Sequence, residues 1–204
     1  MAHAIALEHD VMQPPPDREV GTGVYNEKVG MWVFLASEVM FFTALIGTYI
    51  ILRAAHPDAW APPGQVPNVP ITAVNTFLLI CSSVTMVKAF AAVQDDDQRM
   101  LRIWLVATVL IGATFVGVQV YEYAHLIEKG FIPSEGLYGS TFYTMTGFHG
   151  FHVTMGVLCM MFVTWRAFHG KYTPTDHRGV EVIGLYWHFV DLVWIILFTI
   201  VYLI

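Results

Sequence analysis

The sequence predicts an all-α, polytopic membrane protein built as a bundle of five transmembrane helices. Of its 204 residues, 56% are hydrophobic and only 13% are charged, and the mean hydropathy is +0.57. Ordinary soluble domains are about 45–50% apolar and about 25% charged. Five apolar runs each reach the roughly 20 residues that a helix needs to cross a bilayer: 30–52, 71–93, 103–126, 139–168 and 180–204. Lipid cannot satisfy backbone hydrogen bonds, so runs of this kind have to be helices.

The first predicted span follows a polar, acidic and proline-bearing segment, residues 1–29, which lacks the basic start and apolar stretch of a signal peptide. We expect this segment to be a cytoplasmic arm and residues 30–204 to form the membrane domain. The first span ends at the proline-rich HPDAWAPPGQVPNVP, which cannot continue a helix. The second span ends at the charged turn QDDDQR, the third at EKGFIPSEG and the fourth at HGKYTPTDHRG.

The distribution of Lys and Arg predicts the orientation of the bundle. One side, made of the arm with the second and fourth connections, holds eight of these residues: Arg18, Lys28, Lys88, Arg99, Arg102, Arg166, Lys171 and Arg178. The other side holds only Arg53 and Lys129. Cytoplasmic loops carry the excess of Lys and Arg, so we expect the N-terminus to be cytoplasmic and the C-terminus external. The net charge of −6 gives no indication of nucleic-acid binding.

Several polar residues lie inside the predicted spans, where they are costly and therefore functional candidates. Counting about 1.5 Å per residue from the span ends places them in one layer: Glu38, His149, His152, His188 and Asp191. They come from three different spans. We therefore expect an intramembrane polar network of His149, His152, His188 and Asp191, close to the acidic side chain of Glu38.

A second polar group lies near the outer ends of the spans. Gln119, Glu122 and His125 are spaced by three residues in the third span, which predicts that they share a helix face. Asn75, in the second span, lies at a similar height. These four residues form a predicted outer polar cluster.

Three chemical interpretations of these residues compete. The sequence Glu122-x-x-His125 matches half of the ligand set of di-iron carboxylate bundles, but the second Glu-x-x-His is missing. His152 and His188 lie at equal depth on different spans, as the axial ligands of a haem would. Alternatively, the histidines and Asp191 form interhelical hydrogen bonds, which residue spacing favours over haem ligation.

Five segments, one in each span, together resemble a known family. They are ASEVMFF at 36–42, NTFLLICSSVT at 75–85, YEYAHLI at 121–127, TGFHGFHVTMGV at 146–157 and GLYWHFVDLVWIILFTIVYL at 184–203. In this order they resemble subunit III of the haem-copper terminal oxidases, in its five-helix bacterial form. The first segment is similar to the carbodiimide-reactive glutamate segment of that family.

The resemblance implies a subunit of a respiratory cytochrome c oxidase in the bacterial cytoplasmic membrane. It implies that this chain has no cofactor, metal ligand or catalytic residue of its own. Haem and copper belong to partner subunits, and the expected partners are subunit I by direct contact, subunit II, subunit IV as a further candidate, and membrane phospholipid. The positions that match His149, His152 and His188 are not metal ligands in the family. Two alternatives stay open, which are a quinol oxidase and an accessory protein of a nitric oxide reductase.

Glu38 is the candidate site residue with the clearest chemistry. A carboxylate without a cation in low dielectric is disfavoured, so we expect Glu38 to hold a proton and to donate a hydrogen bond to the polar layer. The resemblance implies that subunit III supports proton entry while the catalytic proton routes belong to subunit I. We therefore expect Glu38 to support proton uptake rather than to act as an obligate relay.

Overall fold

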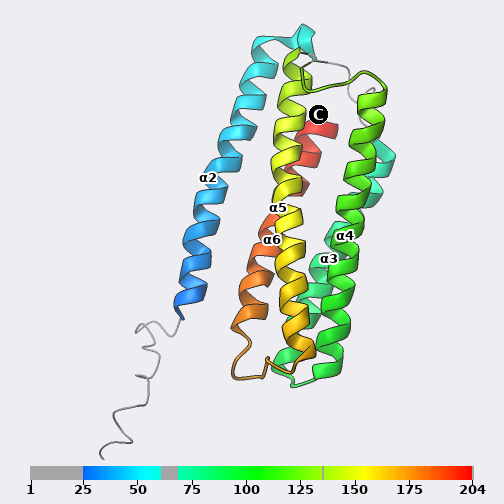
Figure 1. Ribbon diagram of the computed structural model, residues 1–204. Coiled ribbons are helices and arrows are strands. Elements are labelled where there is room, and N and C mark those ends of the chain that lie inside the picture. The colour runs from blue at the N-terminus through cyan, green and yellow to red at the C-terminus, as the bar shows by residue number, and fades with distance from the viewer. Residues whose placement is uncertain (1–24, 61–68, 135, 204) are drawn as a thin grey trace, which may run out of the picture.

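The computed structural model describes residues 25–60, 69–134 and 136–203, and in these ranges it is all-helical (Figure 1). The long helices are α2 (Asn26–Ala55), α3 (Val69–Gln94), α4 (Gln98–Glu128), α5 (Gly136–Phe168) and α6 (Arg178–Phe198). A short 3-10 turn, η1 (Pro57–Ala59), follows α2, and a π-helical turn, η2 (Thr199–Leu203), extends α6. All five long helices are long and apolar enough to cross a membrane. The predicted fold class is therefore confirmed.

The helix ends lie close to the predicted connections. The predicted arm of residues 1–29 falls mostly on residues outside the described ranges, and α2 already begins at Asn26. The charged turn between α3 and α4 caps the next helix, because the Asp97 side chain accepts hydrogen bonds from the backbone N–H groups of Arg99 and Met100 at 3.1 and 2.9 Å. Gly130 follows α4 with a φ of 86°, a backbone conformation that favours glycine at a helix C-terminus.

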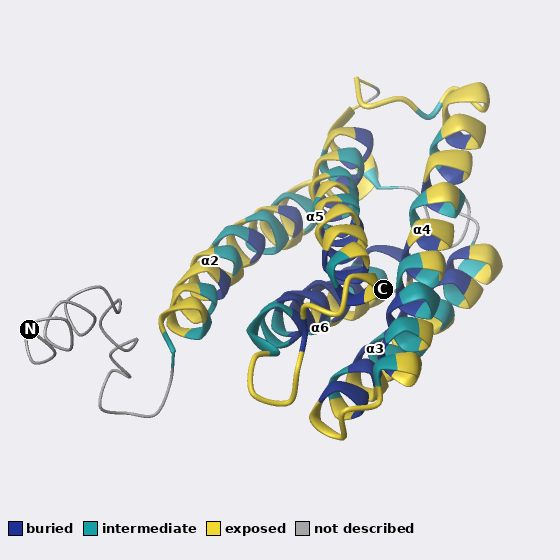
Figure 2. Ribbon diagram, turned by 60° about the horizontal axis from the view of Figure 1, so that its bottom comes forward, coloured by how far each residue is buried: buried dark blue, intermediate teal, exposed yellow. Residues whose placement is uncertain are grey.

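The five helices run along a common direction, with α2 at one side of the bundle (Figure 1). Helices α3 and α5 each pack against both α4 and α6. Among the long helices, α2 packs mainly against α5 and α6. The buried residues of α2 are three, Leu35, Phe42 and Tyr49, at intervals of seven. This spacing places them on one face, so the rest of α2 faces outward (Figure 2).

The centre of the bundle is built around Trp187 on α6, which is 1% exposed. Its indole fits against two glycines of other helices. A Cβ added at Gly112 would lie 2.7 Å from the ring, and one added at Gly156 would lie 3.0 Å from it. The indole N–H donates to Ser82 Oγ on α3 at 2.9 Å, and Trp194 donates in the same way to Thr76 Oγ1 at 2.9 Å. Small residues and hydroxyls thus dock α6 onto its neighbours, as is usual between helices in membranes.

At one end of the bundle, the first turn of α2 is tied to the first turn of α6. Lys28 Nζ lies 2.5 Å from Glu181 Oε1, and the Tyr25 hydroxyl donates to the same carboxylate. Burial and this hydrogen bond raise the pKa of Tyr25, so its hydroxyl stays a donor at neutral pH. The contact fixes α2, which has few buried residues, against the rest of the bundle.

Candidate functional site

Glu38 on α2 and His152 on α5 meet in the seam between these two helices. Glu38 Oε2 lies 3.0 Å from His152 Nε2, and the two side chains are 17% and 12% exposed. The other ring nitrogen, Nδ1, lies 2.7 Å from the carbonyl oxygen of Phe148. A carbonyl oxygen only accepts, so Nδ1 must carry a hydrogen.

This geometry determines how many protons the pair holds. With a hydrogen on Nδ1, a neutral His152 presents a lone pair on Nε2, and Glu38 must then be the acid that donates to it. If Nε2 carries a hydrogen instead, His152 is an imidazolium and Glu38 a carboxylate. In both forms one shared proton lies between Glu38 and His152. Glu38 and His152 therefore form a proton-holding pair within the membrane.

Aromatic side chains surround the proton-holding pair. The ring of Phe42 lies 5.1 Å from that of His152, centroid to centroid, and the rings of Phe151 and Phe41 lie 5.8 and 6.3 Å away. The hydroxyl of Tyr186 donates to the backbone carbonyl of His152 at 2.9 Å. These contacts hold the imidazole in place and keep the shared proton in apolar surroundings.

Asp191 and His188, both on α6, share a different partner, Ser83 on α3. The Ser83 hydroxyl donates to Asp191 Oδ2 at 2.6 Å, and His188 Nδ1 lies 3.1 Å from the same hydroxyl oxygen. Since the single hydroxyl hydrogen of Ser83 goes to Asp191, His188 must donate from Nδ1 to the Ser83 oxygen. The other ring nitrogen, Nε2, takes no part in this contact. The second carboxylate oxygen of Asp191 is buried and has no hydrogen-bond partner in the described part of the chain.

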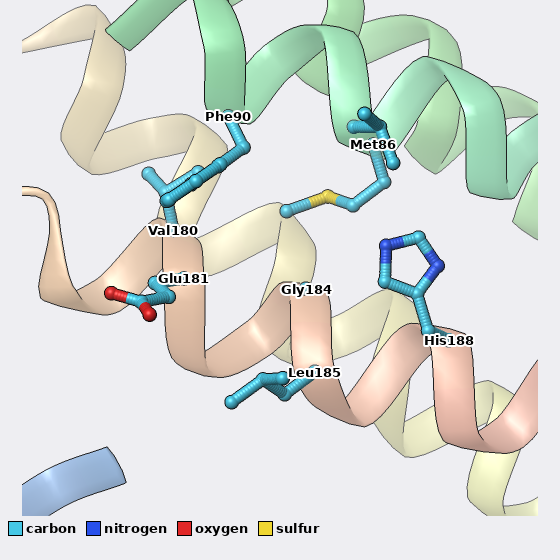
Figure 3. A pocket seen from close by; sticks show the side chains of 8 residues that line it. Met86, Phe90, Val180, Glu181, Gly184, Leu185 and His188 are labelled. Atoms are coloured by element: carbon cyan, nitrogen blue, oxygen red, sulfur yellow. The ribbon is translucent and has the colours of Figure 1, made fainter. Parts of the chain in front are cut away.

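A pocket of about 190 Å³ lies beside this triad, between α3 and α6. Figure 3 shows the His188 ring at one end of the pocket with a ring nitrogen turned toward it, and Glu181 at the other end. The wall between them is apolar and consists of Met86, Val87, Phe90, Val180, Gly184 and Leu185.

His149 on α5 takes no part in either group. It is 0% exposed, its ring stacks on Trp194 at 4.7 Å, and neither ring nitrogen has a hydrogen-bond partner among the described residues. Of the predicted network of His149, His152, His188 and Asp191, the described part of the structure joins only His188 and Asp191, through Ser83. The helices turn His152 toward α2, Asp191 and His188 toward α3, and His149 toward the aromatic centre.

The outer polar cluster is also corrected, because its members bond to different partners. Asn75 donates to the Phe115 carbonyl at 3.2 Å, Gln119 donates to the Thr146 carbonyl at 2.9 Å, and Glu122 accepts from Thr72 at 2.8 Å. His125 has a side chain that is 46% exposed, and its ring stacks on Tyr121.

The position of His125 follows from helix geometry. It lies six residues after Gln119, which at 3.6 residues per turn is a rotation of about 240° away from the buried face. Leu126, seven residues after Gln119, continues that buried face instead. Across residues 25–60, 69–134 and 136–203, no three His, Cys, Asp or Glu side chains gather in a way that could hold a metal ion.

Comparison with known proteins supplies the family. The sequence profile described as "Cytochrome c oxidase subunit III" matches residues 18–204. The chain belongs to the cytochrome c oxidase subunit III family. It is 39% identical to cytochrome c oxidase subunit 3 of Thermostichus vulcanus over 98% of this chain and 93% of the relative.

Other relatives of the subunit III family agree. The chain is 44% identical to cytochrome c oxidase subunit 3 of Synechocystis sp. over 85% of this chain and 74% of the relative. It is 43% identical to the probable cytochrome c oxidase subunit 3 of Mycobacterium leprae over 86% and 87% of the two chains. These relatives are named for cytochrome c oxidases, which favours a haem-copper oxidase subunit III over the quinol oxidase alternative.

Carbodiimide labelling tests the chemistry of the proton-holding pair. A hydrophobic carbodiimide partitions into lipid and reacts with a protonated carboxyl group, so Glu38 should be the preferred labelling site of this subunit III. Glu122 and Glu181, nearer the helix ends, should label at least several-fold more slowly. Peptide mass spectrometry after brief labelling measures the ratio. Equal labelling of the three residues would contradict a proton held at Glu38.

Proposed function

We propose that this chain is subunit III of an aerobic cytochrome c oxidase in a bacterial cytoplasmic membrane. It carries no redox centre and packs directly on subunit I, which holds the haem and copper where oxygen is reduced. Subunit II and subunit IV are the further candidate partners, and cytochrome c is the electron donor to the complex. The role of the chain is to support proton uptake and to keep the catalytic subunit active during turnover.

The observation that carries this proposal is the 3.0 Å contact between Glu38 and His152, from which we infer a shared proton. The pair lies in the seam beside α2, the helix whose outward face is least covered by the rest of the chain. That face is available for subunit I, and a proton store at this position lies next to the catalytic partner.

Distances along α2 favour support over an obligate relay. The next acidic residue toward the start of the helix is Glu27, eleven residues away, which corresponds to about 16 Å. A direct proton transfer needs heavy atoms within about 3 Å or one bridging water. On α2 itself, no described acidic residue lies between Glu27 and Glu38 that could form a stepwise route.

The orientation inferred from Lys and Arg completes the proposal. The start of α2, the α3–α4 turn and the α5–α6 connection lie at one end of the bundle (Figure 1), and this end carries Lys28, Arg99, Arg166 and Arg178. We expect this end to be cytoplasmic. A reporter that is active only outside the cytoplasm should be active when fused after Ile204. Activity there of a reporter that works only in the cytoplasm would show that the inferred orientation is reversed.

Purification tests the assignment to an oxidase. The tagged chain, extracted in mild detergent, should bring with it a haem- and copper-containing subunit I and a subunit II with a Cys-x-x-x-Cys copper motif. A nitric oxide reductase as the co-purified partner would reject the proposal. The chain separated from its partners should contain no iron, copper or haem. Stoichiometric metal that is lost on His152→Ala or Glu122→Ala would also reject it.

A further inference from the structure

A second pocket lies at the end of the bundle where α4 begins and α5 ends. Its volume is about 590 Å³, and its lining consists of Gln98, Arg99, Arg102, Ile103, Val106 and Phe168. The α4 residues among them include positions 99, 102, 103 and 106, which follow the spacing of one helix face. Along this face, two arginines lie at the start of α4 and two aliphatic residues follow them, within about 10 Å along the helix axis.

Arg102 is held in place by contacts with α5, and the charges of Arg99 and Arg102 are not balanced by a carboxylate partner in the described ranges. Arg102 Nε donates to the carbonyl of Ala167 at 3.2 Å, and its guanidinium lies over the ring of Phe168 at 5.7 Å. Arg99 is exposed. Neither arginine forms an ion pair with a carboxylate within the ranges that the structure describes.

Two nearby acidic residues, Asp96 and Asp97, already accept hydrogen bonds within the chain. Asp97 caps α4 through its bonds to the backbone N–H groups of Arg99 and Met100, and Asp96 accepts from the Gln98 side chain at 3.3 Å. The side-chain oxygen of Gln98, Oε1, is buried and has no hydrogen-bond partner among the described residues.

The apolar half of the pocket is open to the membrane. Ile103 is 46% exposed and Phe168 is 55% exposed, and both lie on helices that span the bilayer. The pocket therefore offers positive charge at the aqueous boundary and apolar surface below it. Arginine binds phosphate through paired N–H donors, and basic pockets between transmembrane helices bind anionic lipid headgroups.

We propose that this pocket binds one anionic phospholipid, with its phosphate on Arg99 and Arg102 and an acyl chain along Ile103, Val106 and Phe168. This lipid site lies on α4 and α5, away from the Glu38–His152 pair on α2 and α5, and needs only the membrane fold. It stands or falls independently of the oxidase proposal.

The test measures lipid retention by the full chain purified with its native partners. The complex is stripped of lipid in detergent and titrated with phosphatidylglycerol or phosphatidylcholine in mixed micelles, with bound lipid read by native mass spectrometry. Each basic residue near the membrane surface contributes roughly fivefold to anionic-lipid affinity, so Arg99→Gln should weaken phosphatidylglycerol binding by roughly fivefold. The Arg99→Gln/Arg102→Gln double variant should weaken it by more.

A matched control removes two positive charges at the same end without touching the pocket. Lys88→Gln/Lys171→Gln does this, because both lysines are exposed and neither lines the pocket. This control should bind phosphatidylglycerol within about twofold of wild type if the pocket, and not net charge, determines affinity.

Val106→Trp fills the apolar half and leaves both arginines in place, so it should also reduce lipid binding. Four outcomes would overturn the proposal. The first is that the wild type binds phosphatidylcholine as well as phosphatidylglycerol. The second is equal losses in the arginine and lysine variants, and the third is that the wild-type complex retains no lipid because a partner protein covers the pocket. Binding that Val106→Trp leaves unchanged would indicate a site for phosphate alone and would likewise overturn it.

Discussion

Replacing Trp187 with alanine is expected to lower the free energy of unfolding by about 3–5 kcal/mol, the cost of emptying a fully buried aromatic position. The indole fills the space between α4, α5 and α6, where Gly112 and Gly156 leave room for it. Its N–H also donates to Ser82, whose hydroxyl would lose this bond. Other helices cannot close the gap by small shifts, because the ring contacts them on several sides.

Trp165→Ala is the matched control for this prediction. Trp165 is the same residue type in a neighbouring helix, but it is 58% exposed and stacks only on other surface rings such as Phe162. Unfolding followed by helicity in mixed micelles of increasing denaturing detergent should separate the two variants clearly. Equal destabilisation by Trp187→Ala and Trp165→Ala would contradict the central position of Trp187.

Replacing Glu38 with alanine should shorten the active life of the oxidase. The substitution leaves His152 Nε2 without a partner in a closed aromatic seam, at a cost of about 1–3 kcal/mol. A cost of this size loosens the contact between α2 and α5, so the variant should inactivate after several-fold fewer turnovers than the wild type. The measurement is the number of oxygen molecules reduced per complex before activity is lost.

The partner variant gives the control for this loss. His152→Ala leaves Glu38 unpaired and should shorten the active life to a similar extent. The double variant Glu38→Ala/His152→Ala should then lose less than the sum of the two, because residues that bond to each other are not additive. Additive losses would show that the two side chains act separately.

The helices themselves could be predicted from the sequence, for a simple physical reason. Crossing a bilayer requires a run of apolar residues of nearly fixed length, and such runs are visible without any knowledge of packing. The predicted first span, 30–52, lies inside α2 at Asn26–Ala55, and the charged turn after residue 93 lies between α3 and α4. The family could likewise be inferred from short segments in each span.

The bonding partners could not be predicted, because they depend on the rotation of each helix. Counting residues gives only depth along the axis, and it predicts similar heights for His149 and His152. It did not show that one faces Trp194 and the other Glu38. His125 was placed on the wrong face for the same reason.

Ser83 is the partner that sequence reasoning missed, although a pattern pointed to it. It lies seven residues after Thr76, which places both hydroxyls on the same face of α3. Trp194 and His188 lie six residues apart on antiparallel α6 and bond to Thr76 and Ser83, respectively. A stripe of hydroxyls opposite a stripe of Trp, His and Asp could have suggested the α3–α6 interface.

Oxygen consumption per haem by the Glu38→Gln complex tests the supporting role most directly. Glutamine keeps the size of Glu38 and can still donate a hydrogen bond to His152 Nε2, so the complex should assemble with its haem and copper content unchanged. Since our proposal assigns the redox centres to other subunits, oxygen reduction should continue, with the deficit in proton uptake or in active life. Complete loss of oxygen reduction in a correctly assembled complex would make Glu38 an obligate participant and contradict the supporting role.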